Sequence, residues 1–263
     1  MKKLLILIVC TTMLISAQSD KITIKSDQDA IVYLGGELSN IRGMLEMYAQ
    51  LGCRITYKLP NPKEKLKALL VEFDSLMDAL DVKYSNDTLI LDTTKEARNF
   101  WSPVKSVIVK ALAQDMDTDL IKAKTIYIHN NIRSTIKNIS KMKAHLVKTS
   151  KIKYAEEINA VLEIGASARR LSAHYMMRTL NVDDPTIEKH YKKGLSIYKS
   201  SLALLTASTF SKDAKVAEYL KFFKKRLLYF EYIWQVKALT PVLMSKWSYD
   251  VYKKTNELAK FIK

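Results

Sequence analysis

Two segments of the chain carry apolar stripes with the same spacing. In the first, apolar residues follow one another at intervals of 4, 3, 4 and 3 positions: Leu66, Leu70, Phe73, Met77 and Leu80. The second repeats these intervals 125 positions later: Tyr191, Leu195, Tyr198, Leu202 and Leu205. Pro60 and Pro185, which precede the two segments, are also 125 positions apart. Such intervals place side chains on one helix face, so the pattern predicts two equivalent amphipathic helices and an internal duplication.

Residues that break helices are scarce along the chain. Only 6 Gly and 5 Pro occur among 263 residues, and no alternating run of apolar and polar residues is longer than KITIK at positions 21–25. This composition predicts a nearly all-helical protein. Because proline fits the first turn of a helix and disrupts its interior, we expect helices to begin or kink at five positions: Pro60, Pro62, Pro103, Pro185 and Pro241.

The middle of the chain predicts a long helix. Between about Asp119 and Leu180, only Gly165 would interrupt one. About 60 helical residues would span about 90 Å. We therefore expect the last helix of one bundle to run into the first helix of the next, with a break near residues 149–153. The predicted fold is all-α, with two tandem antiparallel four-helix bundles, residues 18–150 and 151–263, that share a long central helix and form an elongated rod.

The first 17 residues have the pattern of a secretory signal peptide. Two lysines precede an apolar run at positions 4–15, and small residues end at Ala17. This run is shorter than the roughly 20 residues that span a bilayer, so a permanent anchor is the less favoured alternative, as is lipidation of Cys10. We expect cleavage after Ala17 and a periplasmic or secreted protein. Its only remaining cysteine would be Cys53, which leaves no internal disulfide.

The charge of the chain favours acidic partners. Removal of the signal peptide with its two lysines would leave 41 basic and 27 acidic residues, a net charge of +14. A small anion, an acidic partner protein or a membrane surface would be attracted to it. Nucleic acid is disfavoured, because export separates the chain from it and no basic helix carries base-reading or stacking side chains. Aromatic residues at positions 222–234 fall on several helix faces, so some could support self-association into a homodimer.

One predicted helix carries charge where a buried face is expected. Residues 164–177 read IGASARRLSAHYMM. The small residues would let a neighbouring helix approach closely, and Arg169 and Ser172 share one helix face because they are three positions apart. We expect Arg169, Ser172 and His174 to face this crevice and to hold an anion or an acidic side chain of a partner. Arg170 stands about 100° further around the helix and is expected to point to solvent.

The longer segment IGASARRLSAHYMMRTLNVDDP resembles the motif that opens the N-terminal sensor module of type IV pilus methyl-accepting transducers, the PilJ/NarX-like module shared with nitrate sensors. Four residues stand at the motif's glycine, arginine, leucine and serine: Ala166, Arg169, Leu171 and Ser172. Arg170 and His174 replace the family's methionine and second arginine. In the first half, residues 29–52 occupy the corresponding place. This segment can be aligned with the motif through its glycines or through the pair Met44–Leu45, and the two alignments give different partners for Arg42.

This resemblance covers most of the chain after the signal peptide, as two tandem modules. It implies a sensor that binds a small oxyanion through the motif arginines, Arg169 and Arg42, near a subunit interface. A guanidinium held on a helix offers a fixed fork of donors that suits a planar anion. The sensors of this family continue into a membrane segment and a signalling region, so we expect this chain to pass a signal to another protein.

No motif for catalysis or for a cofactor stands out. The sequence has no HExxH pair, CxxC motif, GxSxG elbow or glycine-rich phosphate loop. We interpret the four histidines as lone surface or internally satisfied residues: His129, His145, His174 and His190. We therefore expect no enzyme, metal or cofactor. The leading interpretation is an exported sensor-like binding protein for a small anion or a partner protein. The alternative is a structural or adaptor protein of the cell envelope.

Overall fold

A computed structural model describes residues 22–53, 62–114, 116–236 and 239–262, and the predicted signal peptide with Cys10 lies outside them. The described part contains eight α-helices, one short 3-10 helix and no strand. The prediction of an all-helical protein is confirmed. The helices are α1 (Asp27–Leu51), α2 (Pro62–Lys83), α3 (Thr88–Ala113), α4 (Thr118–Thr149), α5 (Ala155–Thr179), α6 (Ile187–Ala207), α7 (Ala214–Gln235) and α8 (Pro241–Phe261), with the 3-10 helix η1 at Thr209–Lys212.

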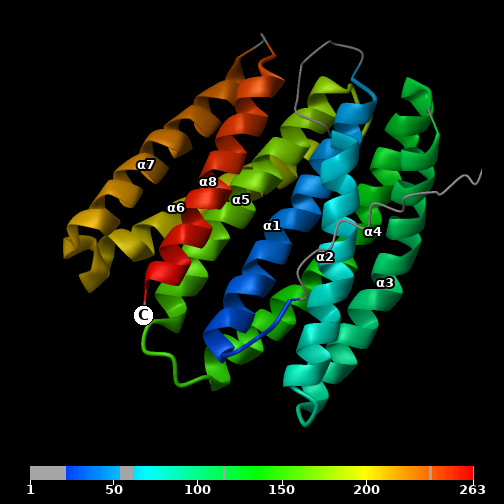
Figure 1. The fold of residues 1–263 in the computed structure, drawn as a ribbon. Helices are drawn as coiled ribbons and strands as arrows, with labels where there is room; N and C mark the ends of the chain where they lie inside the picture. Colours follow the sequence, from blue (N-terminus) through cyan, green and yellow to red (C-terminus); the bar gives the residue numbers. More distant parts are fainter. Residues whose placement is uncertain (1–21, 54–61, 115, 237–238, 263) are drawn as a thin grey trace, which may run out of the picture.

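Helices α1 and α5 form the centre of the molecule (Figure 1). Each has 25 residues, of which 18 are buried. Two contacts show that they run parallel. Gly35 lies against Leu162 in the first half of both helices, and Gly52 lies against Leu180 at their ends. Helices α2 and α8 cover one side of this pair, and α4 and α6 cover the other. α3 packs outside on α2 and α4, and α7 packs outside on α6 and α8.

The predicted apolar stripes lie on α2 and α6, which begin 125 positions apart at Pro62 and Ile187. Every residue of the first stripe is buried, and so is every residue of the second except Leu195, which is partly buried. The central aromatic residues make equivalent contacts. Phe73 packs on Trp101 of α3, and the hydroxyl of Tyr198 donates to the carbonyl of Phe223 in α7. Each stripe therefore joins a second helix to the third helix of the same half.

The chain turns back between α4 and α5 instead of continuing as one helix. α4 ends at Thr149, α5 begins at Ala155, and the two halves lie side by side through α1 and α5 (Figure 1). The predicted long central helix and the end-to-end rod are therefore wrong. The physical reason is that α5 has almost no exposed face, since 18 of its 25 residues are buried. An extended α5 at the junction of a rod would expose apolar side chains, whereas the turn buries them against α1.

Local signals explain several helix starts. Side-chain caps begin four helices: Ser26 for α1, Asp87 for α3, Asp117 for α4 and Asp213 for α7. Pro62 and Pro241 occupy first turns, as predicted. Pro103 lies inside α3, and Pro60 lies outside the described residues.

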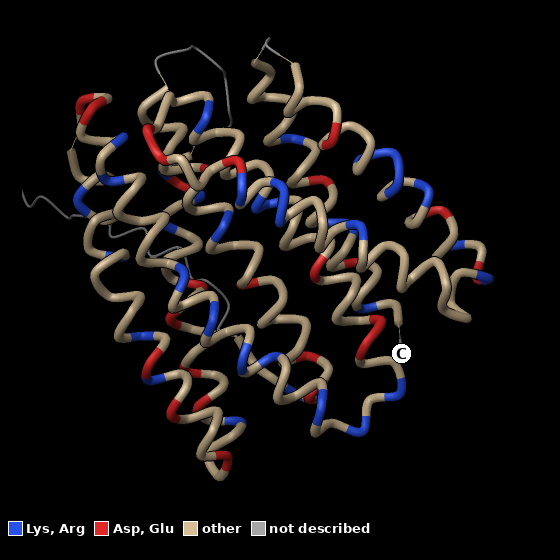
Figure 2. Tube along the Cα trace, turned by 180° about the vertical axis from the view of Figure 1, so that it is seen from behind, with Lys and Arg blue, Asp and Glu red and all other residues tan. Residues whose placement is uncertain are grey.

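The basic excess of the sequence is spread along the helices of both halves (Figure 2). None of the described helices combines the length and the apolar character needed to cross a membrane.

The adjacent residues Gly35 and Gly36 allow a direct test of the central packing. A Cβ added at Gly35 would lie 2.6 Å from Leu162 Cδ1 and 2.8 Å from its Cβ, whereas at Gly36 the nearest atom would be the Tyr252 hydroxyl at 4.0 Å. Alanine is favoured over glycine in a helix by about 1 kcal/mol, but overpacking costs about 1–3 kcal/mol. In urea denaturation, Gly35→Ala should lower the free energy of unfolding and Gly36→Ala should preserve or raise it. Equal effects would contradict the close contact.

Candidate functional site

Arg169 lies inside the protein and pairs with an acidic residue of its own chain. Its Nη1 is 2.8 Å from Glu46 Oε2 on α1 and donates to Ser248 Oγ on α8 at 3.1 Å. Both members of the ion pair are buried, with exposed fractions of 4% and 0%. Gly43 contributes the space, because a side chain there would collide with the guanidinium. The predicted close helix approach is present, and α1 of the same chain supplies the carboxylate.

Arg170 does not point to solvent, and that expectation is wrong. Its Nη1 is buried and has no hydrogen-bond partner among the described residues. The side chain lines a cavity of about 240 Å³ between α1, α4, α5 and α6. Because α5 is covered on all sides, neighbouring arginines about 100° apart enter different interior spaces.

We call this cavity the basic pocket. Its polar lining consists of four Arg or Lys residues and three histidines: Arg42, Arg133, Arg170, Lys193, His129, His174 and His190. Apolar residues complete the described lining, to which no acidic side chain contributes. Arg42 is the most enclosed of the cationic residues, and its Nε and Nη1 have no hydrogen-bond partner in the described part of the chain. Burial, with the neighbouring charge of Arg170, lowers the pKa of Arg42 to about 9.

One carboxylate beside the pocket offsets only part of this charge. Glu163 interacts electrostatically with both Arg42 and Arg170. Its Oε1 is also 2.5 Å from the Nζ of Lys143, which is buried. A single negative charge thus serves three cations, and positive charge remains in excess at the pocket.

Three of the histidines have internal hydrogen-bond partners, as predicted, but they are not isolated from one another. The ring centroids of His129, His174 and His190 are 5.1 to 5.4 Å apart. The fourth, His145, instead bonds to Asp87 at 2.8 Å. The clustered rings come from α4, α5 and α6, so their meeting depends on the tertiary fold.

The His129 and His174 rings form a pair with room for one proton. His129 Nδ1 lies 3.1 Å from an Asp184 carboxylate oxygen, and His174 Nδ1 lies 2.7 Å from the Arg170 carbonyl. Both partners only accept, so both Nδ1 atoms donate. Both Nε2 atoms are then unprotonated, and their lone pairs face each other across 3.2 Å. Burial lowers the pKa of both rings, so the pair is neutral at pH 7, and a nearby anion would favour a proton shared between the two Nε2 atoms.

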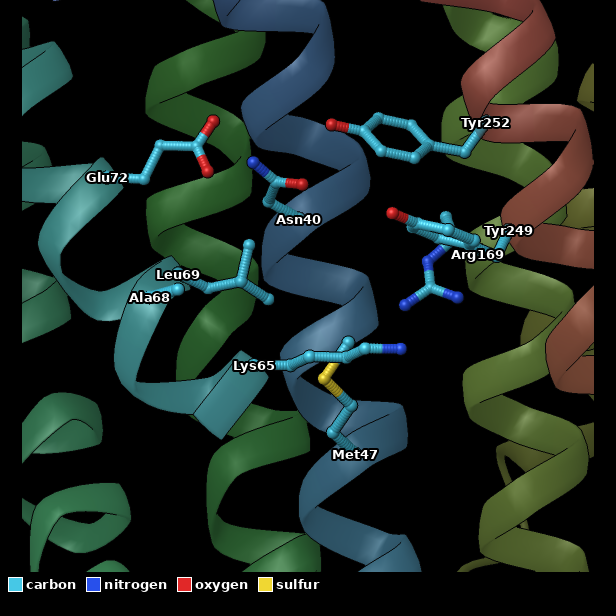
Figure 3. A pocket seen from close by; sticks show the side chains of 9 residues that line it. All are labelled: Asn40, Met47, Lys65, Ala68, Leu69, Glu72, Arg169, Tyr249 and Tyr252. Atoms are coloured by element: carbon cyan, nitrogen blue, oxygen red, sulfur yellow. The ribbon is translucent and has the colours of Figure 1, made fainter. Parts of the chain in front are cut away.

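The structure separates the four predicted ligand-binding residues. Arg42 and His174 line the basic pocket, whereas Arg169 lines a second cavity between α1, α2, α5 and α8, which we call the second pocket (Figure 3). Ser172 is fully buried, lines neither pocket, and its hydroxyl has no partner among the described residues. Sequence reasoning missed Arg133 and Lys193, because nothing local shows that α4 and α6 bring them to Arg42.

Known proteins add no further constraint. No family model, curated protein or solved structure matches this chain. The resemblance to the PilJ/NarX-like module therefore stays a prediction. In the described residues, no group of three His, Cys, Asp or Glu side chains is arranged to hold a metal ion. The charged side chains that line the two pockets are the chemistry that a function of this chain would use.

The buried ion pair makes a prediction about stability. Arg169→Met should lower the free energy of unfolding by about 3–5 kcal/mol, because it leaves the Glu46 carboxylate buried without a counter-charge. The double variant Arg169→Met/Glu46→Leu should recover most of that loss in a denaturant titration. As a control, Arg98→Met removes a half-exposed pair with Asp78 and Asp81 and should cost about 1 kcal/mol or less. Losses that simply add in the double variant would contradict the coupling.

The histidine cluster makes a prediction about pH. Burial and Arg133 lower the pKa of His190 to about 4, and the ordinary value is 6.5. As the pH falls through 6.5, the unfolded state therefore takes up protons before the folded state, and stability decreases towards pH 4. Thermal unfolding of His190→Gln should show a smaller decrease over this interval than the native chain. The comparison is needed because Glu37, whose pKa is raised to about 8 by burial, contributes a change of opposite sign. Parallel pH profiles would contradict a neutral His190.

Proposed function

We propose that this chain is an exported, non-enzymatic, sensor-like protein that binds a small oxyanion in the basic pocket. One observation carries the proposal. Arg42 and Arg170, from the two central helices, bring buried guanidinium N–H groups without hydrogen-bond partners in the described structure to one cavity. Buried polar groups are normally paired, and an unpaired charge costs several kcal/mol. An oxyanion would supply both the acceptors and the missing negative charge.

The pocket suits a small anion in size and in charge. Its volume of about 240 Å³ is below the roughly 300 Å³ at which pockets for drug-sized ligands begin. Arg133 and Lys193 add cationic groups from α4 and α6. The His129 and His174 pair can take up a proton when the anion arrives, so affinity should increase as the pH falls below 7.

The position of the pocket supports a sensing role. Its lining comes from α1 and α4 of the first half and from α5 and α6 of the second. A bound anion would contact both halves at once and would favour one arrangement of the four helices over others. A partner protein that contacts these helices could detect the change in their arrangement and so respond to ligand binding.

Anion binding can be tested by thermal shift and calorimetry with phosphate, sulfate and nitrate, at constant ionic strength maintained with chloride. We expect one of these oxyanions to stabilise the native chain and chloride to have no comparable effect. Arg170→Ala should weaken binding at least tenfold, since a charged hydrogen bond contributes about 1.5–3 kcal/mol. Lys193→Ala should also weaken binding. The adjacent Lys192 pairs with Glu188 outside the pocket, so Lys192→Ala should leave binding unchanged.

The same experiment separates a binding site from a structural role. Arg42→Met removes a buried charge that the shared Glu163 offsets only in part. It should therefore raise the unfolding temperature of the ligand-free protein and weaken the binding of the oxyanion. The structural or adaptor alternative predicts no oxyanion-specific stabilisation in the native chain. A loss of stability in Arg42→Met together with no anion effect would overturn the proposal.

A further inference from the structure

The second pocket is the counterpart of the basic pocket in the duplicated fold. Each lies between α1, α5, the second helix of one half and the fourth helix of the other. Lys65 and Ala68 line the second pocket, and His190 and Lys193, 125 positions later, line the basic pocket. Equivalent positions therefore face equivalent spaces, but they carry different side chains.

Opposite charges are separated within the second pocket (Figure 3). At one end, the Lys65 ammonium and the Arg169 guanidinium lie 5.4 and 5.9 Å from the centroid of the Tyr249 ring. At the other end, the carboxylate of Glu72 points towards Asn40 and the hydroxyl of Tyr252 (Figure 3). The basic pocket shows no such division, because its polar lining is basic throughout the described residues.

The acidic end lacks a counter-charge. Asn40 Nδ2 donates to Glu37 Oε2 at 3.4 Å, and the Glu72 carboxylate points towards the same amide (Figure 3). Glu37 is 1% exposed, and its other oxygen has no hydrogen-bond partner among the described residues. Neither Glu37 nor Glu72 forms an ion pair with a described lysine, arginine or histidine. Burial raises the pKa of Glu37 to about 8, so at pH 7 this side chain is largely protonated, and Glu72 is the carboxylate that this end presents to the pocket.

We propose that the second pocket binds a free α-amino acid, with its carboxylate against Lys65 and Arg169 and its ammonium group against Glu72. Arg169 keeps its ion pair with Glu46 through Nη1, and its guanidinium, which packs against Gly43, also lines the cavity. The ammonium group would supply the cation that Glu72 lacks among the described residues. This proposal does not depend on anion binding in the basic pocket.

The volume of the pocket and its remaining lining residues indicate which side chain the bound amino acid should carry. Its volume is about 190 Å³, well below the roughly 300 Å³ of the smallest pockets for drug-sized ligands. Met47, Leu69 and the rings of Tyr249 and Tyr252 form an apolar wall. A short apolar side chain fits this wall, whereas a second charged group would have no partner there.

The test begins with ligand chemistry on the native chain. The twenty L-amino acids are screened by thermal shift, and the most stabilising one is measured by calorimetry beside its N-acetyl and its carboxamide derivatives. We expect an amino acid with a short apolar side chain to bind, and each derivative to bind at least tenfold more weakly, because each removes one charge. No stabilisation by any amino acid, or equal affinity for the derivatives, would overturn the proposal.

Paired variants then locate the site. Lys65→Met and Glu72→Gln should each weaken the binding of the amino acid at least tenfold. The control is Lys67→Met, which should leave the affinity unchanged because Lys67 lies on the same helix but is exposed and outside the pocket. Lys193→Ala should also leave it unchanged, which separates this site from the basic pocket. Circular dichroism confirms that each variant is folded. Binding that survives both Lys65→Met and Glu72→Gln would place the amino acid elsewhere and overturn the assignment.

Discussion

The close parallel contact between α1 and α5 determines the rest of the structure. Gly35 and Gly43 let the two helices approach, with Leu162 and Arg169 filling the space that side chains would otherwise occupy. Each central helix is then covered by outer helices on both sides. Polar residues on α1 and α5 consequently lie inside the protein, where they must pair with one another or face a cavity. The buried ion pair and both pockets follow from this constraint.

The sequence predicts the outer helices better than the central ones, and the reason is periodicity. α2 and α6 have a polar face, so the stripes from Leu66 and from Tyr191 identify both the helices and their buried sides. α1 and α5 bury polar residues together with apolar ones, and the apolar period therefore cannot show where they pack. The predicted break near residues 149–153 is present, but the turn at residues 150–154 contains neither Gly nor Pro, and nothing in it indicates that the chain reverses direction there.

The arginines of α5 show the same limit at the level of the site. Sequence reasoning placed Arg169 in a crevice and Arg170 in solvent, as an amphipathic helix would require. In a helix buried on all sides, however, adjacent residues enter two interior spaces. Arg169 meets Glu46, and Arg170 meets the basic pocket. Arg42, Arg133 and Lys193 could be placed in the same pocket only once the packing of α1, α4 and α6 around α5 was known.

The distribution of unpaired charge argues that the two pockets are more than packing defects. Apolar side chains of similar volume would stabilise a purely structural scaffold at these positions, because a buried charge without a partner is costly. Instead, unpaired donors of Arg42 and Arg170 face one pocket, and Glu72, a carboxylate without a described cation, lines the other. The α1 and α5 helices separate the two groups, so neither can neutralise the other. The packing of α2 with α8 and of α4 with α6 around the central helices thus leaves two comparable spaces, and their different charges suit them to chemically different small ligands.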